Sequence, residues 1–256
     1  MRKLHFSFLA LTLLTVGCMS FIAKQKKTPI TVYLIGDSTI SIKETKANPE
    51  TGWGMPFKYF FDNTVTVDNR AKNGRSTRTF IEENLWQPVS QALKAGDYVF
   101  IQFGHNDEVA TKKSYTTEKD YRANLERFIS ETRARKAQPV LITPAARRKF
   151  DAAGKIEETH QVYAAIVREV AKKQQVPLID LDQKSQELLQ QYGPEFSKKL
   201  FLHLKANEHP NYPDGKEDDT HFNELGAREM AQIVLAGIKD LKLELAERVV
   251  KPTLKK

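Results

Sequence analysis

Three short segments of the chain carry residue types that together allow nucleophilic chemistry. They are GDST at 36–39 with Ser38, GHND at 104–107 with Asn106, and DDTH at 218–221 with His221. A serine hydroxyl is a weak nucleophile until a base takes its proton. Histidine suits that task because its unperturbed pKa of roughly 6.5 lies near neutral pH. The segments therefore predict a serine nucleophile served by a histidine base.

The base needs a partner, usually a carboxylate, that fixes its tautomer and stabilises the imidazolium. Asp218 lies three residues before His221. That spacing lets both side chains share one tight loop, with the carboxylate on Nδ1 and Nε2 facing Ser38. Asp219 is the alternative, but from its position the carboxylate reaches back to the ring less easily. We therefore prefer Asp218.

An attacked carbonyl becomes an oxyanion, and the sequence offers three donors for it. They are the amide of Ser38, the amide of Gly74 in NGRS (73–76), and the side-chain amide of Asn106. Losing one such donor costs on the order of 10²–10³ in rate. Glycine at position 74 allows both close approach and a positive φ. Each motif alone is typical of a turn or a helix cap, so the prediction depends on their combination.

The elements that must position these residues are short apolar strands separated by helices. Helical spacing of apolar residues runs through 121–129 and 162–170, and Asn223 is a candidate cap for a last helix. Buried strands between helices indicate a parallel sheet covered on both faces. The predicted fold class is α/β, a flavodoxin-like three-layer α/β/α sandwich, with no strand order readable. The expected strands are 30–35, 64–67, 97–103, 139–143 and 176–180.

The candidate residues follow these strands directly. Segment 37–39 follows the first strand, 69–77 the second and 104–107 the third. In an open α/β sheet, ligands bind at the carboxyl ends of the strands. Segment 218–221 precedes the last helix, and we expect it to fold over the same edge.

Composition indicates one globular domain over residues 24–256. The chain has 256 residues, of which 40% are hydrophobic and 28% charged, without a linker or a repeat. Its only cysteine is Cys18, so the folded part has neither a disulfide nor a thiol nucleophile. The net charge of +8 slightly favours an acidic polymer as partner. Nucleic acid is not an expected partner, because no recognition motif is present.

Residues 1–23 have the layout of a secretory signal peptide. Arg2 and Lys3 precede an apolar stretch from Phe6 to Val16, and small residues follow. The segment LTVGC, ending at Cys18, resembles a bacterial lipoprotein signal whose cysteine is lipidated. We therefore expect an exported protein that is periplasmic, extracellular or lipid-anchored at the envelope. No membrane insertion of the mature domain is expected.

The four blocks, in this order, resemble the SGNH (GDSL) hydrolase superfamily. Within it the chain is most similar to the rhamnogalacturonan acetylesterases. This resemblance implies a flavodoxin-like sandwich and cofactor-free, metal-free deacetylation of an acetylated pectic polysaccharide. It implies Ser38 as nucleophile, His221 as base with Asp218, and Ser38, Gly74 and Asn106 as oxyanion hole. The segments that carry the closer resemblance are IGDST (35–39), GWG (52–54), FGHND (103–107), TP (143–144), RR (147–148) and DDTHF (218–222).

Substrate contacts are less determined by the sequence. Trp53 either stacks on a sugar ring or packs in the core. Arg75 is the preferred arginine for a uronate carboxylate because it follows the oxyanion-hole glycine, and a solvated surface position is its alternative. His105, Asp107 and Glu108 fit no usual zinc or calcium spacing, so we expect no metal.

Two other functions remain open at this point. One is a general acyl or lipid esterase of the same superfamily. The other is a non-catalytic carbohydrate-binding protein on the same scaffold, which the intact serine, asparagine and histidine disfavour. The sequence predicts no oligomeric state.

Overall fold

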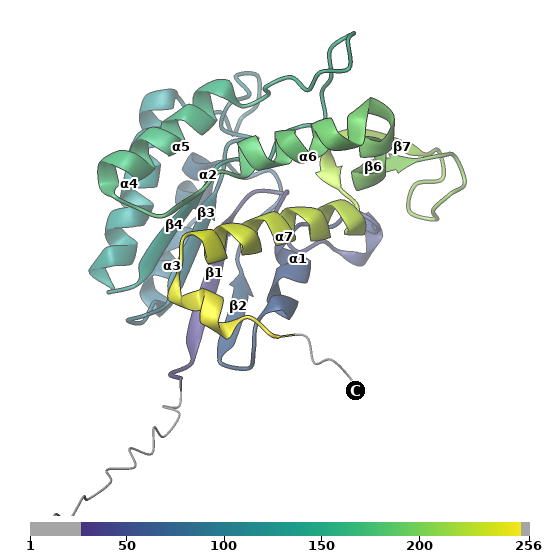
Figure 1. Cartoon of the computed structure of the whole chain (residues 1–256). Coiled ribbons are helices and arrows are strands. Elements are labelled where there is room, and N and C mark those ends of the chain that lie inside the picture. Colours follow the sequence, from purple (N-terminus) through teal and green to yellow (C-terminus); the bar gives the residue numbers. More distant parts are fainter. Residues whose placement is uncertain (1–26, 252–256) are drawn as a thin grey trace, which may run out of the picture.

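A central five-stranded sheet organises the chain, and every neighbouring pair of its strands is parallel (Figure 1). The computed structural model describes residues 27–251, so the predicted signal peptide and Cys18 lie outside the described residues. The strand order is β2-β1-β3-β4-β5, the flavodoxin-like order, with its switch point between β1 and β3. The strands are β1 (Ile30–Gly36), β2 (Val65–Asn69), β3 (Tyr98–Gln102), β4 (Gln138–Ile142) and β5 (Leu178–Ile179).

Helices cover both faces of this sheet, which confirms the predicted three-layer sandwich. One apolar cluster joins alternate strand residues such as Leu34 and Phe100 to α1 (Gly54–Phe57), α6 (Leu181–Phe196) and α7 (Glu224–Asp240). On the other face, a second cluster joins Ile35 and Ile101 to four more helices. These are α2 (Thr77–Glu82), α3 (Trp86–Ala92), α4 (Glu118–Ala134) and α5 (Gln161–Gln174).

Polar side chains begin the helices that border the sheet's carboxyl edge. Asn223 accepts a hydrogen bond from the Gly226 amide at 3.0 Å and starts α7, as predicted. Ser76 and Thr79 form a capping box at the start of α2. A side-chain cap of this kind contributes about 1 kcal/mol to stability. Short 3₁₀ turns fill the connections: η1 (Thr45–Ala47), η2 (Lys58–Phe60), η3 (Ser197–Leu200) and η4 (Glu244–Arg248).

A separate antiparallel hairpin was not predicted from the sequence. It consists of β6 (Phe201–Leu204) and β7 (Lys216–Phe222) and lies beside the end of α6 (Figure 1). Phe201 pairs with Phe222, but the next residue of β6 pairs with Asp218, which leaves a bulge on β7. The segment expected to be a loop is therefore the bulged part of a strand.

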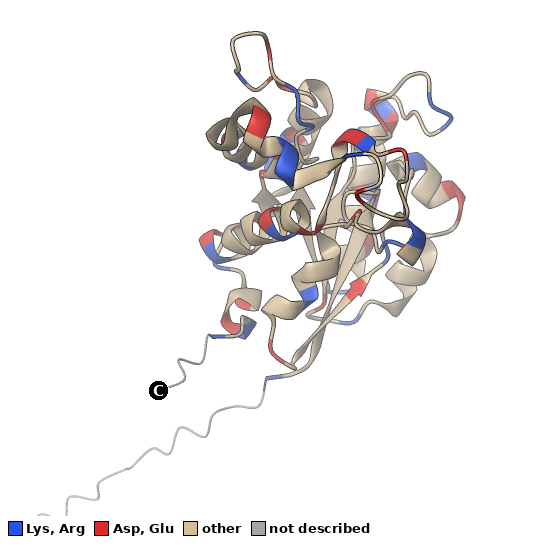
Figure 2. Cartoon of the chain, turned by 90° about the vertical axis from the view of Figure 1, so that its right-hand side faces the viewer, with Lys and Arg blue, Asp and Glu red and all other residues tan. Residues whose placement is uncertain are grey.

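The charged residues do not gather in one block. Figure 2 shows basic and acidic positions interspersed along the ribbon in that view. Within residues 27–251, we find no helix that is both long and apolar enough to cross a bilayer.

Candidate active site

Ser38 lies on the turn that follows β1, at the switch point of the sheet. Asp37 holds this turn, because its Oδ1 accepts hydrogen bonds from the Thr39 amide at 2.9 Å and the Thr39 hydroxyl at 2.8 Å. Ser38 itself is 7% exposed. The nucleophile candidate is therefore fixed by a buried carboxylate one residue earlier.

The hairpin brings His221 onto this serine. The ring Nε2 lies 2.9 Å from Ser38 Oγ, and Nδ1 lies 2.9 Å from Asp218 Oδ2. The other oxygen of Asp218 accepts the amides of Thr220 at 2.8 Å and His221 at 2.9 Å. One carboxylate thus closes the bulge of β7 and orients the imidazole. The arrangement allows a proton to pass from the serine hydroxyl to the histidine.

Asp218 is held in its ionised form. Burial alone raises its pKa, but the hydrogen bonds from the His221 ring and from the two amides lower it well below its usual range. Asp219 points elsewhere, with Oδ1 at 2.7 Å from both His203 Nε2 and Arg148 Nη1. Of the two aspartates weighed from the sequence, the structure brings Asp218 to the ring.

The three expected oxyanion donors share one hollow with the base. Ser38, Gly74, Asn106 and His221 all line a cavity of about 360 Å³. Gly74 has a φ of 75°, a conformation that favours glycine. A Cβ at this position would meet no protein atom within 4 Å, so its conformation explains the glycine better than crowding within the chain.

The amide of Asn106 has a fixed orientation. Its Nδ2 donates to the Arg75 carbonyl at 3.1 Å, and its Oδ1 accepts from Lys112 Nζ at 3.2 Å. An ammonium only donates and a carbonyl only accepts, so the two contacts exclude a flipped amide. The second hydrogen of Nδ2 is left for a ligand in the hollow.

A buried lysine joins the nucleophile turn to the Gly74 loop. Lys43 Nζ donates to the Ser38 carbonyl at 2.6 Å and to Asn73 Oδ1 at 2.8 Å, and it lies 2.7 Å from Glu50 Oε1. Asn73 immediately precedes the oxyanion-hole glycine. Sequence reasoning missed Lys43, because a lysine in a loop has no spacing that distinguishes it from a solvated one.

Two further buried groups belong to the Asn106 loop. His105 Nδ1 lies 3.4 Å from Asp37 Oδ2. Burial lowers the pKa of His105 to about 4, although Asp37 opposes that shift. Burial also raises the pKa of Asp107 to about 7, against hydrogen bonds from the Thr77 amide at 2.9 Å and the Thr77 hydroxyl at 2.6 Å. Both residues flank Asn106 and order its loop.

The acidic residue after this loop is engaged in ion pairs. Glu108 lies 2.7 Å from Arg147 Nη2 and 2.9 Å from His160 Nδ1. Arg147 continues to the His105 carbonyl and to the Thr220 hydroxyl, each at 3.2 Å. This network ties the Asn106 loop to the His221 bulge. Across residues 27–251, no group of three His, Cys, Asp or Glu side chains is arranged to hold a metal ion.

Trp53 does not face a ligand, which corrects the stacking alternative. Its ring is fully buried, and Nε1 donates to Gln102 Oε1 at 2.6 Å. A Cβ on Gly52 would come within 2.2 Å of the Ser41 carbonyl, so the glycine before Trp53 lets the chain press against the nucleophile loop. The tryptophan belongs to the core.

Arg75 also differs from the expectation of a free guanidinium. Its Nε and Nη2 each lie 2.8 Å from Glu83 Oε2, and Nη1 donates to the Asn73 carbonyl at 2.9 Å. The side chain is therefore already paired within the chain. Arg75 serves the site through its carbonyl, which holds Asn106.

Comparisons with known proteins identify a family and several relatives of this chain. Residues 34–229 match the GDSL-like Lipase/Acylhydrolase family. The chain is 44% identical to "Rhamnogalacturonan acetylesterase RhgT" of Bacillus subtilis, over 88% of this chain and 96% of that protein. It is 35% identical to "Probable rhamnogalacturonan acetylesterase YesY" of the same organism, over 86% of this chain and 97% of that protein.

Solved structures show the same architecture. Protein YXIM of Bacillus subtilis superposes with a TM-score of 0.73 at 25% identity, over 85% of this chain and 58% of that one. A catalytic mutant of Axe2, an acetylxylan esterase from Geobacillus stearothermophilus, gives a TM-score of 0.59 at 16% identity, over 82% and 94%. The latter likeness concerns the fold alone. The profile match and the two Bacillus relatives together show that this chain belongs to the GDSL-like lipase/acylhydrolase family.

Proposed function

We propose that the protein is a serine esterase that removes acetyl groups from pectic rhamnogalacturonan. The observation that carries ester hydrolysis is the contact of Ser38 Oγ with His221 Nε2 at 2.9 Å, backed by Asp218. The substrate follows from RhgT, whose name states this activity and whose sequence is 44% identical over 96% of its length.

The first half of the proposed reaction forms an acetyl-serine. His221 takes the proton of Ser38 as the oxygen attacks the acetyl carbonyl. The negative oxygen that results is stabilised by the amides of Ser38 and Gly74 and by Asn106 Nδ2. The bond to the sugar oxygen then breaks, and His221 returns its proton to the departing hydroxyl.

The second half releases acetate. A water molecule attacks the acetyl carbonyl while His221 accepts its proton, and the same donors stabilise the oxyanion. Collapse of this intermediate frees acetate and returns the proton to Ser38. Asp218 keeps one ring tautomer in both halves and stays ionised, because its pKa is held far below neutrality.

The test compares acetate release from three polymers: acetylated rhamnogalacturonan, acetylated homogalacturonan and acetylated xylan. We expect the highest kcat/KM on rhamnogalacturonan, and no release by Ser38→Ala protein that remains folded by circular dichroism. Aryl esters of increasing chain length form a second arm. A preference for long chains over acetyl would instead indicate a general acyl esterase.

We also propose that the protein is exported, on the strength of the charge and hydropathy layout of residues 1–23. Cell fractionation with mass spectrometry of the mature N-terminus tests this proposal. A lipid on Cys18, lost in Cys18→Ser, indicates an anchored lipoprotein. A full-length chain in the cytoplasm contradicts export.

A further inference from the structure

Two hollows lead away from the catalytic cavity along the outer side of the nucleophile loop. The catalytic cavity and a middle hollow of about 890 Å³ share Asn73 in their walls. The middle hollow shares Ile42 and Asn69 with an outer hollow of about 620 Å³ beside α1. We call the middle and outer hollows together the lateral groove. The volumes of these two hollows suit a ligand larger than one acetylated sugar.

Each of the three hollows contains one lysine whose ammonium forms no ion pair with a carboxylate of residues 27–251, although Glu44, which Lys46 pairs at 2.8 Å, lies near enough to Lys72 to interact with its charge. These are Lys112 in the catalytic cavity, Lys72 in the middle hollow and Lys58 in the outer hollow. The arginines beside them are already paired: Arg70 with Asp68, Arg75 with Glu83 and Arg228 with Glu224. The unpaired cations therefore follow the path of the groove. A ligand that carries carboxylates at intervals along its length would match this row of lysine ammonium groups in charge.

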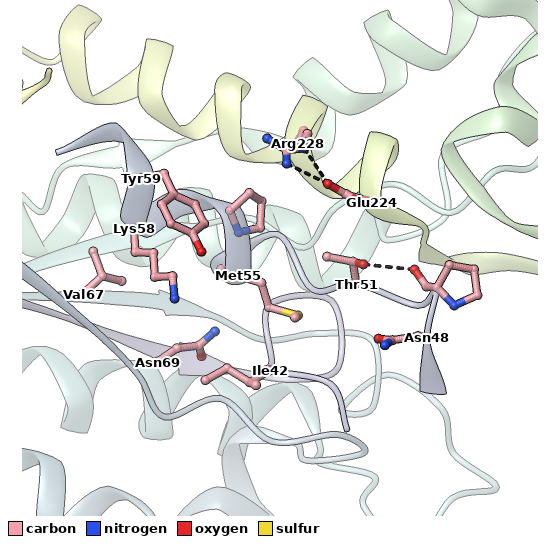
Figure 3. A pocket seen from close by; sticks show the side chains of 13 residues that line it. Ile42, Asn48, Thr51, Met55, Lys58, Tyr59, Val67, Asn69, Glu224 and Arg228 are labelled. Carbon is pink, nitrogen blue, oxygen red and sulfur yellow. Dashed lines mark hydrogen bonds and ion pairs between the residues drawn. The ribbon is translucent and has the colours of Figure 1, made fainter. Parts of the chain in front are cut away.

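The outer hollow also presents an aromatic ring. Tyr59 is 70% exposed, and Lys58 Nζ lies 4.9 Å from its ring centroid. In Figure 3, Lys58 and Tyr59 lie next to each other, with Asn69 and Ile42 along the lower edge of the pocket. An exposed ring beside a cation suits a sugar that carries a carboxylate, because the apolar face of the sugar stacks on the ring.

We propose that the lateral groove binds an acidic oligosaccharide chain, with uronate carboxylates at Lys72 and Lys58 and a sugar ring on Tyr59. The inference rests on the proposed function for its catalytic end, since the bound chain is the continuation of the deacetylated polymer. Lys58, Lys72 and Tyr59 are binding residues that touch the substrate away from the reacting bond.

The test uses Tyr59→Ala, Lys58→Gln and Lys72→Gln, with KM measured on acetylated rhamnogalacturonan. We expect Tyr59→Ala to raise KM by roughly three- to tenfold and each lysine variant by about two- to fivefold. The lysine effects should shrink with added salt. On uncharged acetylated xylan they should vanish, and all three variants should keep wild-type kcat/KM on an aryl acetate.

The chain supplies a matched control outside the groove. Phe196 is 64% exposed, with Lys199 Nζ 5.3 Å from its ring centroid, and neither residue lines the three hollows. Phe196→Ala and Lys199→Gln should leave KM on every substrate unchanged. Equal effects of Tyr59→Ala and Phe196→Ala overturn the proposal.

A binding measurement separates this inference from the proposed activity. Calorimetry with deacetylated rhamnogalacturonan oligosaccharides should give a Kd that rises in Tyr59→Ala and falls as the oligosaccharide lengthens. If the wild-type protein releases no acetate but shows this binding pattern, the proposed esterase activity is refuted and the proposed groove is supported. If the wild-type protein releases acetate but its Kd depends neither on Tyr59 nor on the length of the oligosaccharide, the groove is refuted and the esterase activity is supported.

Discussion

The nucleophile and the oxyanion donors stand on loops of the parallel sheet, whereas the base and its carboxylate stand on a two-stranded hairpin outside it. On the sheet side, Ser38 and Asn106 are 7% and 5% exposed. Buried Asp37 and Lys43 hold the Ser38 turn, and buried Asp107 holds the Asn106 loop. On the hairpin side, the side chains of His221 and Asp218 are 28% and 17% exposed. Buried side chains around it fix the sheet half. In the hairpin half, Asp218 orients the imidazole from within, and Arg147 connects the Thr220 hydroxyl to the His105 carbonyl. Different substitutions should therefore disrupt the two halves of the site.

The largest expected effect comes from the hairpin half. Among residues 27–251, His221 is the one side chain that forms a hydrogen bond with the Ser38 hydroxyl. His221→Ala removes it, so kcat on an aryl acetate should fall by about 10⁴-fold or more. His203→Ala on the facing strand is the matched control and should change kcat little. A fall of less than tenfold in His221→Ala would mean that another base serves the serine.

Asp218→Asn should lower kcat by about 10²–10⁴-fold, because the amide can present a hydrogen to Nδ1 and favour the wrong tautomer. One oxygen remains to accept the Thr220 and His221 amides, so the bulge should persist. Asp219→Asn is the control, measured in the same assay. An equal loss in both variants would contradict the assignment of Asp218.

Substitution of Lys43 tests the sheet half of the site. Lys43→Met removes the ammonium that links Asn73 Oδ1 to the Ser38 carbonyl and leaves the Ser41 hydroxyl as the remaining donor to Asn73. The adjacent Gly74 amide is then held less firmly, so we expect kcat to fall by about 10- to 100-fold, less than for outright loss of a donor, with KM nearly unchanged. Lys46→Met, at an exposed neighbouring lysine, should leave kcat unchanged.

A double-mutant cycle decides whether Lys43 acts through the Gly74 loop. If it does, adding Asn73→Ala to Lys43→Met should cost little more than Lys43→Met alone. If the two substitutions lower kcat additively, Lys43 does not act through the Gly74 loop. If Lys43→Met lowers stability without lowering kcat, the role of Lys43 is structural.

The last substitution, at Asp107, tests stability and not turnover. The pKa of Asp107 in the folded protein, about 7, lies above the ordinary value of 3.8. A raised carboxyl pKa makes ionisation oppose folding, so this group lowers stability as pH rises from about 4 through 7. Asp107→Asn should flatten that dependence and raise the free energy of unfolding at pH 8 by on the order of 1–4 kcal/mol. Urea unfolding at pH 4, 6 and 8 measures it; parallel wild-type and variant curves would contradict it.

The sheet half was largely predictable from the sequence, because its strands are apolar runs and its chemistry follows directly where each run stops. Ile30–Gly36 and Tyr98–Gln102 are buried and end within a few residues of Ser38 and Asn106. The order of the strands was not predictable, since buried parallel strands have nearly interchangeable sequences.

The hairpin half was only partly predictable. The spacing of Asp218 and His221 indicated their pairing, but β7 reads KEDDTHF, with too few apolar residues to resemble a strand. Trp53 was ambiguous for a different reason: its burial depends on a hydrogen bond to Gln102, which is remote along the chain, and on the close approach of Gly52 to Ser41. Lys43 and the lateral groove could be recognised only in the folded structure, because the residues that contact Lys43 or line the groove come from several loops.

The most direct measurement of how the two halves meet is covalent labelling with an aryl phosphonate, followed by mass spectrometry of the labelled peptide. A single adduct on Ser38 is expected, forming at least about 10²-fold more slowly in His221→Ala because the general base is lost. An adduct on another side chain, or labelling of Ser38 at an unchanged rate without His221, would contradict the account.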